Sequence, residues 1–136
     1  MPTKPHFAPQ LYIPSGITDL SFYTNALGAE ELYRYTNADN SVHVAEFSIQ
    51  GTIFHVHENN RPHDGQLLPQ SVKGVTCLIG LFVDDVEFYL QRTLKNGAQL
   101  IMPTTHFDYH YRQAEIKDPF GHVWVFQKKF EHNLAD

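Results

Sequence analysis

The chain carries the same order of apolar and polar segments twice. Residues 11–32 read LYIPSGITDLSFYTNALGAEEL, and residues 81–100 read LFVDDVEFYLQRTLKNGAQL. Each stretch starts with a short apolar segment, continues with apolar residues at helical spacing, and closes with Gly-Ala and a nearby leucine. Equivalent residues, here and further downstream, lie 66 to 70 positions apart. This repetition indicates an internal duplication.

Three strand-like segments follow the helix in each copy, so each half is predicted to be a β-α-β-β-β unit. They span residues 31–35, 42–49 and 52–58, and then 99–102, 109–117 and 122–128. We expect an α+β fold in which the two repeats form a curved mixed sheet around a cleft. The chain is predicted to be one domain over residues 1–136, with repeat one at about 7–60, a loop-like linker at about 61–74 and repeat two at about 75–129.

Both helices carry start and stop signals in the sequence. In the second copy, Asp84 is placed to accept the first amide protons of the helix, and Gly97 supplies a left-handed stop. The first copy stops in the same way at Gly28. Apolar residues form a stripe along each predicted helix: Ile17, Leu20, Phe22, Tyr23 and Leu27 in the first, and Val86, Tyr89, Leu90, Thr93 and Leu94 in the second.

A two-residue turn at Gln50-Gly51 would fix the register of the hairpin around it. Residue numbers that face each other would then sum to about 101, which places Glu46 opposite His55 and, on the other face, Phe47 opposite Phe54. The phenylalanine face is predicted to be the core under the helix. Glu46 and His55 therefore belong to the face that the helix does not cover, about 5 Å apart at their Cβ atoms.

A carboxylate beside a histidine supports several functions. The two side chains could hold a metal, act as a general base, or bind a ligand through hydrogen bonds. The structural alternative is an ordinary cross-strand ion pair on a solvated face. We take Glu46 and His55 as candidate catalytic residues and keep that alternative open.

The second half contains a stronger turn signal than the first. Residues 118–121 read DPFG, and the strand after them is predicted to send Trp124 and Phe126 into the core while Val123, Val125 and Gln127 face the cavity. Before the turn lies an aromatic group that includes Tyr111. Within it, Arg112 is a candidate anchor for an anion or carboxylate, or else an exposed arginine that stacks on tyrosine.

Composition and net charge indicate which kinds of partner and environment the chain does not suit. Ten Lys and Arg against fifteen Asp and Glu give a net charge of −5, and the basic residues are scattered, so we expect no nucleic-acid partner. No apolar run is long enough to cross a membrane. The single cysteine, Cys77, excludes an internal disulfide and is predicted to be a buried small hydrophobe in a cytoplasmic protein.

These segments together resemble the vicinal oxygen chelate superfamily, which includes glyoxalase I, bleomycin-resistance proteins and extradiol dioxygenases. The resemblance rests on the paired β-α-β-β-β units, on FYTNALGAEEL after the first strand and on the closing DPFGHVW. It extends from about residue 7 to residue 128 and looks most like the PhnB-like branch. It implies the glyoxalase/bleomycin-resistance fold, and it does not specify a reaction.

The resemblance also implies where a metal would sit. The four positions that hold the divalent ion in the family's enzymes fall on Ala8, His55, Leu78 and Val125, and only His55 among them can coordinate a metal. We therefore expect no cofactor and an incomplete metal site. A rebuilt site for Ni, Zn, Mn or Fe stays open, with Glu46 and His57 beside His55, or with His6.

In metal-free relatives of this kind, two chains pair and their curved sheets enclose aromatic-lined pockets. The resemblance thus implies a homodimer that binds a small molecule, aromatic or cationic, in the sheet cleft. The alternatives are a metal-dependent lyase, isomerase or dioxygenase, and a metal-free enzyme that uses Glu46 and His55 as an acid–base couple. The remaining candidate ligand-binding residues are Gln10, Tyr12, His57, Phe82, Tyr111, Arg112 and Val125.

Overall fold

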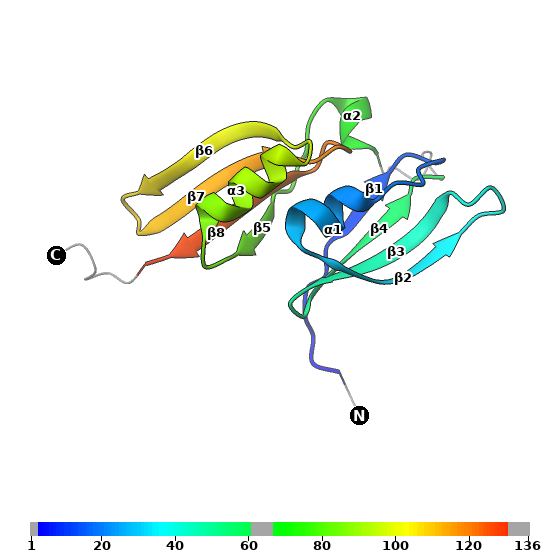
Figure 1. The fold of residues 1–136 in the computed structure, drawn as a ribbon, viewed down its shortest axis with the longest axis horizontal. Helices are drawn as coiled ribbons and strands as arrows, with labels where there is room; N and C mark the ends of the chain where they lie inside the picture. The colour runs from blue at the N-terminus through cyan, green and yellow to red at the C-terminus, as the bar shows by residue number, and fades with distance from the viewer. Residues whose placement is uncertain (1–2, 61–66, 131–136) are drawn as a thin grey trace.

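The computed structural model describes residues 3–60 and 67–130, which form two four-stranded mixed sheets (Figure 1). The first sheet has the strand order β1-β4-β3-β2, and the second has the order β5-β8-β7-β6. In each sheet the first strand of the unit runs parallel to the last, and the other neighbours are antiparallel. The predicted α+β class and the two β-α-β-β-β repeats are confirmed.

The elements of the first half are β1 (Gln10–Ile13), α1 (Ser21–Leu27), β2 (Glu30–Thr36), β3 (Val42–Ile49) and β4 (Thr52–Glu58). Those of the second half are α2 (Pro69–Val72), β5 (Ile79–Phe82), α3 (Val86–Lys95), β6 (Gln99–Phe107), β7 (Tyr111–Lys117) and β8 (Val123–Lys129). The strand β6 is five residues longer than expected, because the turn to β7 lies at the left-handed His110 rather than before residue 109.

The hairpin between β3 and β4 has the predicted register. Glu46 pairs with His55, and Phe47 pairs with Phe54. Gln50 and Gly51 have positive φ angles of 51° and 92°, the conformation of a two-residue turn whose twist matches that of the two strands.

The helices begin and end close to the predicted residues, with one correction. The residue that caps α3 is Asp85 and not Asp84: its carboxylate accepts from the Phe88 amide at 3.0 Å. The cap must lie immediately before Val86, the first helical residue, for its side chain to reach the third amide of the helix, so Asp84 is one position too early. At the end of α1, Gly28 adopts the expected left-handed conformation.

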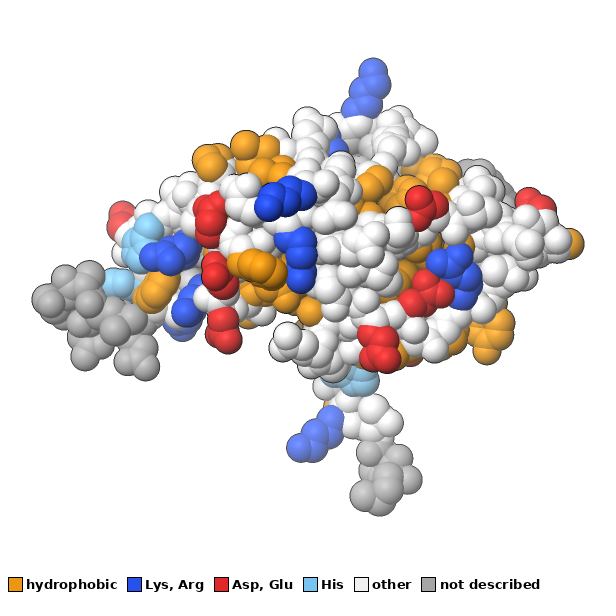
Figure 2. Space-filling model, in the orientation of Figure 1, with side chains coloured by type: hydrophobic (Ala, Val, Ile, Leu, Met, Phe, Trp, Pro, Cys, Tyr) orange, Lys and Arg blue, Asp and Glu red, His pale blue; other side chains and the backbone are white. Residues whose placement is uncertain are grey.

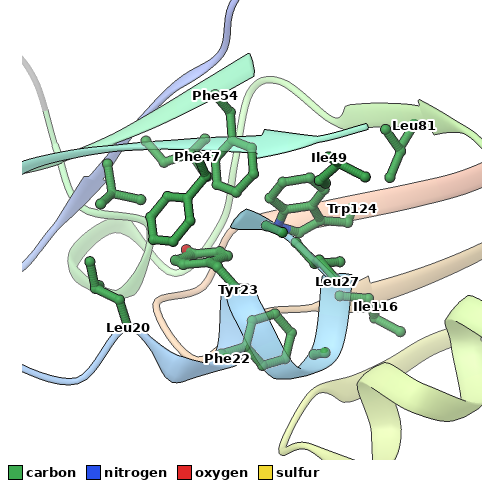
Figure 3. Close-up of a cluster of buried hydrophobic side chains, with 14 of the residues drawn as sticks. Leu20, Phe22, Tyr23, Leu27, Phe47, Ile49, Phe54, Leu81, Ile116 and Trp124 are labelled. Carbon is green, nitrogen blue, oxygen red and sulfur yellow. The ribbon is translucent and has the colours of Figure 1, made fainter. Parts of the chain in front are cut away.

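One hydrophobic core serves both halves. Tyr23 of α1 lies at its centre, with its ring centroid 5.4 Å from those of Phe47 and Phe54 and 6.3 Å from that of Trp124 (Figure 3). Phe54 of the first sheet also contacts Trp124 of the second, with centroids 5.3 Å apart. The predicted core positions Trp124 and Phe126 are confirmed as buried. The faces that carry Phe54 and Trp124 are therefore the covered faces of the two sheets.

The DPFGHVW segment is held by the buried carboxylate of Asp118. It accepts from the Tyr23 hydroxyl at 2.9 Å and from the Trp124 indole at 3.0 Å, and its other oxygen accepts from the backbone amides of Phe120 and His122. Burial, and then the negative charge of Asp118, raise the pKa of Tyr23 well above its usual value, so the phenol remains a donor. This network fastens the turn of the second half to the helix of the first.

Arg92 of α3 makes a second connection between the halves. Its Nε donates to the Ala26 carbonyl near the end of α1 at 2.7 Å. The guanidinium also lies over the rings of Phe88 and Tyr89. It occupies the space beside Gly28, where an added Cβ would come within 3.0 Å of it. The two helices accordingly lie side by side at the centre of the molecule (Figure 1).

Two expectations for the segment between the halves are wrong. The predicted linker contains the short helix α2, because Leu68 is extended and Pro69 suits the first helical position. Residues 61–66 of the predicted linker lie outside the described residues. Cys77 is exposed and not buried. It precedes Ile79, the first paired residue of β5, so no neighbouring strand covers it.

The outer surface carries charges of both signs. Figure 2 shows lysine and arginine side chains interspersed with aspartate and glutamate on the side that bears the helices. Among the described residues, no helix is long and apolar enough to span a bilayer.

Candidate functional site

The predicted pair lies on the uncovered face of the first sheet. His55 Nε2 donates to Glu46 Oε1 at 2.7 Å, and the two side chains are only 23% and 24% exposed. Because a carboxylate can only accept, Nε2 carries the hydrogen, and in the neutral form of the ring Nδ1 is then an acceptor. The pair is therefore an imidazole held in one tautomer beside a half-buried carboxylate.

All four strands of the sheet contribute to the row that contains this pair. Gln10 of β1 is in register with His55, and Tyr33 of β2 is in register with Glu46. Residues in register across a sheet point to the same face. The row thus reads Gln10, His55, Glu46, Tyr33, which places a neutral amide at one end and a phenol at the other.

The neighbouring row is aromatic. Tyr12 of β1 is in register with His57 of β4, their ring centroids 6.2 Å apart, and Val44 pairs with both His57 and Tyr35. The rings of Tyr33 and Tyr35 meet edge to face at 5.3 Å. The structure therefore brings Gln10, Tyr12, His57 and the predicted pair to one face.

A second glutamate–histidine pair lies at the far end of the same ladder, and it was not anticipated. His43 Nδ1 donates to Glu58 Oε1 at 2.9 Å, and Asn37 donates to the same oxygen at 3.0 Å. The hydrogen bond from His43, aided by those from Asn37 and Ser15, outweighs burial and lowers the pKa of Glu58. The residue numbers 43 and 58 also sum to 101, so the hairpin arithmetic that found Glu46 and His55 contained this pair.

The uncovered face of the second sheet has different chemistry. The Tyr109 hydroxyl donates to Gln113 Oε1 at 3.1 Å, and Gln113 Nε2 donates to Gln127 Oε1 at 2.9 Å. Gln127 Nε2 lies over Gly80, where an added Cβ would come within 2.7 Å of it. Among the described residues, this face carries a chain of neutral amides with the carboxylate of Glu115 one register position away, and no imidazole lies in that chain.

The predicted residues of the second half do not all share that face. Phe82 is 61% exposed, and its ring lies 6.1 Å from that of Tyr111. Val125 is buried, although it is outside the main core cluster, and its register neighbours in the sheet are Gly80 and Glu115. Arg112 lies on the opposite face of β7 from Tyr111, since side chains alternate along a strand, and its guanidinium stacks on Phe130 rather than on a tyrosine.

The residues at the family's metal positions do not fit a divalent ion. Ala8, Leu78 and Val125 offer no ligand atom, and His55 is engaged by Glu46 through Nε2. In the described parts of the chain, no three His, Cys, Asp or Glu side chains are grouped to hold an ion. A step routed through a bound metal is not supported by this donor set.

Cavities lie where the halves meet, and two of them reach candidate residues. One, of about 540 Å³, reaches Gln10 and Tyr12, and the other, of about 560 Å³, lies between the β3–β4 turn and Phe82. Glu46 and His55 line neither of them. Within one chain, the candidate residues are therefore divided between an open sheet face and cavities along the seam.

Known proteins share this fold and part of the sequence. The profile of the Glyoxalase/Bleomycin resistance protein/Dioxygenase superfamily matches residues 18–126. An uncharacterized protein of Mycobacterium bovis is 28% identical over 123 residues, which cover 89% of this chain and 81% of that protein.

Solved structures give the same picture of the fold. A gene product of Arabidopsis thaliana superimposes with a TM-score of 0.69 at 22% identity, covering 91% of this chain and 98% of that one. TioX from Micromonospora sp. ML1 superimposes with a TM-score of 0.67 at 19% identity, covering 92% and 100%.

Proposed function

Because the chain belongs to the Glyoxalase/Bleomycin resistance protein/Dioxygenase superfamily, we propose that it binds a small aromatic cation on the uncovered face of the first sheet. The observation that carries this proposal is the 2.7 Å hydrogen bond between His55 and Glu46 on a face flanked by tyrosines. His55 holds Oε1 of the carboxylate, which leaves Oε2 for a ligand. An aromatic cation would place its charge there and its ring against Tyr33 or Tyr12.

A fluorescence titration with 9-aminoacridine, an aromatic cation, tests this proposal. We expect saturable binding that is weakened about 10-fold in Glu46→Gln, which corresponds to the loss of a charge-assisted contact of about 1.4 kcal/mol. Glu87→Gln on α3 is the matched control, because it removes the same charge from a distant exposed helix and should leave the affinity unchanged. Equal affinities of the wild type and Glu46→Gln would refute the assignment.

We also propose that the chain holds no resident divalent metal. The support is the donor set at the four family positions, where His55 alone can coordinate. Elemental analysis of protein purified without chelators or a histidine tag should show no stoichiometric metal. Nickel, zinc, manganese or iron that is present in the wild type and lost in His55→Ala would overturn this and favour the metal-dependent lyase, isomerase or dioxygenase.

The arrangement of the uncovered faces supports a homodimer. Tyr35 on the first sheet is 64% exposed and Phe82 on the second is 61% exposed. A second chain could cover such aromatic surface and close the open face around Glu46 and His55. Light scattering coupled to size exclusion should give twice the monomer mass, and a monomer at micromolar concentration would contradict the proposal.

We also propose a branch of the superfamily and a cellular compartment for the chain. The DPFGHVW segment, residues 118–124, supports a place in the PhnB-like branch. One exposed cysteine without a partner cysteine suits the reducing cytoplasm.

Acid–base catalysis is a second candidate function. It is favoured by the tautomer of His55, whose Nδ1 can accept a proton while Glu46 stabilises the resulting charge. A catalytic couple requires both groups, so a substrate turned over by the wild type should be bound but not converted by His55→Gln. Conversion retained in that variant would exclude this role.

A further inference from the structure

The cavity of about 540 Å³ at the seam between the halves shares Gln10 and Tyr12 with the uncovered face of the first sheet, and its other lining residues come from elsewhere in the fold. It lies between β1, the α2 helix and the segment that leads into β5. Its volume is that of a site for a small molecule. Among the described residues that line it are Leu11, Tyr12, Val72, Cys77, Ile79 and His122.

The lining carries no formal charge from acidic or basic residues. None of its described residues is Asp, Glu, Lys or Arg. A charged ligand would lose hydration without gaining a counter-charge here, so the cavity favours a neutral molecule. The half-exposed Val72 and Leu67 leave apolar surface at the rim that such a molecule would cover.

His122 supplies a directed polar atom in this apolar lining. Its Nε2 donates to the Tyr12 carbonyl at 2.7 Å, and a carbonyl can only accept, so Nε2 carries the hydrogen. In its neutral form the ring then has an acceptor lone pair at Nδ1. Its backbone amide is fixed by Asp118 at 3.0 Å, so the ring projects from a rigid turn.

We propose that the seam cavity binds a small neutral phenol or aromatic alcohol. The ring lies among the apolar residues, and the hydroxyl donates to Nδ1 of His122. This ligand class differs from the aromatic cation of the first sheet, and Glu46 and His55 do not line the cavity.

Cys77 provides the reporter for a test, because it is the only cysteine, it is exposed and it lies in the lining. The rate at which the thiol reacts with an aromatic disulfide reagent is measured while 4-ethylphenol is added. We expect saturable slowing of at least about 5-fold. The methyl ether 4-ethylanisole, which lacks the donor, should require about 10-fold higher concentration, equivalent to about 1.4 kcal/mol.

Two variants separate this site from the first. Glu46→Gln should leave the 4-ethylphenol titration unchanged. Gly74→Leu, at a lining position where an added Cβ meets nothing within 4 Å and no left-handed backbone is required, should fold and weaken the titration by at least about 5-fold. Absence of saturable slowing, equal protection by the ether, or loss of binding in Glu46→Gln would each overturn the proposal.

Discussion

The two glutamate–histidine pairs on the β3–β4 ladder have the same composition and different surroundings. The Glu58 side chain is 7% exposed, and Asn37 and Ser15 bind it in addition to His43. The Glu46 side chain is 24% exposed, and its hydrogen bond comes from His55. The carboxylate of Glu58, with several internal donors, contributes to the fold, whereas that of Glu46 has one donor among the described residues and would keep an oxygen for the proposed ligand.

This difference gives a physical criterion for telling the two kinds of pair apart. Removing a buried acceptor leaves its donors without a hydrogen-bond partner. The free energy of unfolding then falls further as the number of such donors rises. Removing a partly exposed partner such as Glu46 allows water to replace it. The stability of the chain should therefore depend on one pair and ligand binding on the other.

The largest expected effect is on stability. Glu58→Ala should lower the free energy of unfolding by about 2 to 3 kcal/mol, because Asn37 and His43 lose their shared acceptor. Glu46→Ala should lower the free energy of unfolding by less than about 1 kcal/mol. Urea denaturation of both variants measures the difference, and equal losses would remove the distinction between the pairs.

Ligand binding should show the opposite order. His55→Ala should weaken 9-aminoacridine about 10-fold, or about 1.4 kcal/mol, because Glu46 loses the group that orients it. His43→Ala should change the affinity by less than about 2-fold. The same fluorescence titration tests both, and a larger effect of His43→Ala would reverse the assignment.

The buried carboxylate of Glu58 should also affect the pH dependence of stability. The pKa of Glu58 is lower in the folded chain than its ordinary value of 4.5, so its contribution is complete above that value and is lost as the pH falls through the lowered pKa. Unfolding free energies measured between about pH 6 and pH 3 should fall less steeply in Glu58→Gln. Hydrogen bonds from Ser21 and Ser41 lower the pKa values of the Asp19 and Asp39 carboxyls. These two groups should therefore maintain part of the pH dependence of the unfolding free energy in Glu58→Gln. An unchanged slope would argue against the lowered pKa of Glu58.

The smallest expected effect concerns a glutamate in the second half of the chain. Glu115 is the repeat equivalent of Glu46, but its partner across the ladder is Val125 instead of a histidine. Glu115→Gln should therefore change the affinity for 9-aminoacridine by less than about 2-fold. A loss as large as that of Glu46→Gln would show that both sheets contribute charge to one binding site.

Sequence patterns predict the structure correctly where it depends on residues that are close together in the chain. A two-residue turn leaves one register, so Gln50-Gly51 alone predicts the pairing of Glu46 with His55. The same arithmetic contained His43 and Glu58, yet only packing shows that Asn37 and Ser15 converge on that carboxylate. The importance of a pair thus depends on segments that pattern alone does not bring together.

Positions governed by tertiary contacts were harder to place. Tyr111 and Arg112 are both candidate ligand-binding residues, but adjacent strand residues point to opposite faces, so the two side chains do not share one face. Cys77 was predicted as buried from the apolar run around it, and the strand begins only at Ile79. The error for Cys77 arises because the start of the strand decides which residues are covered.

The contact between Phe54 and Trp124 has a consequence for how the duplicated chain folds. Each repeat resembles a small independent module, but neither can complete its interior without aromatic rings from the other. We therefore expect the two repeats to unfold as one cooperative unit, with a single transition in thermal unfolding. A fragment that ends after β4 would expose Phe54 and Tyr23 to water, and it should regain ordered structure only when the missing half is supplied in trans.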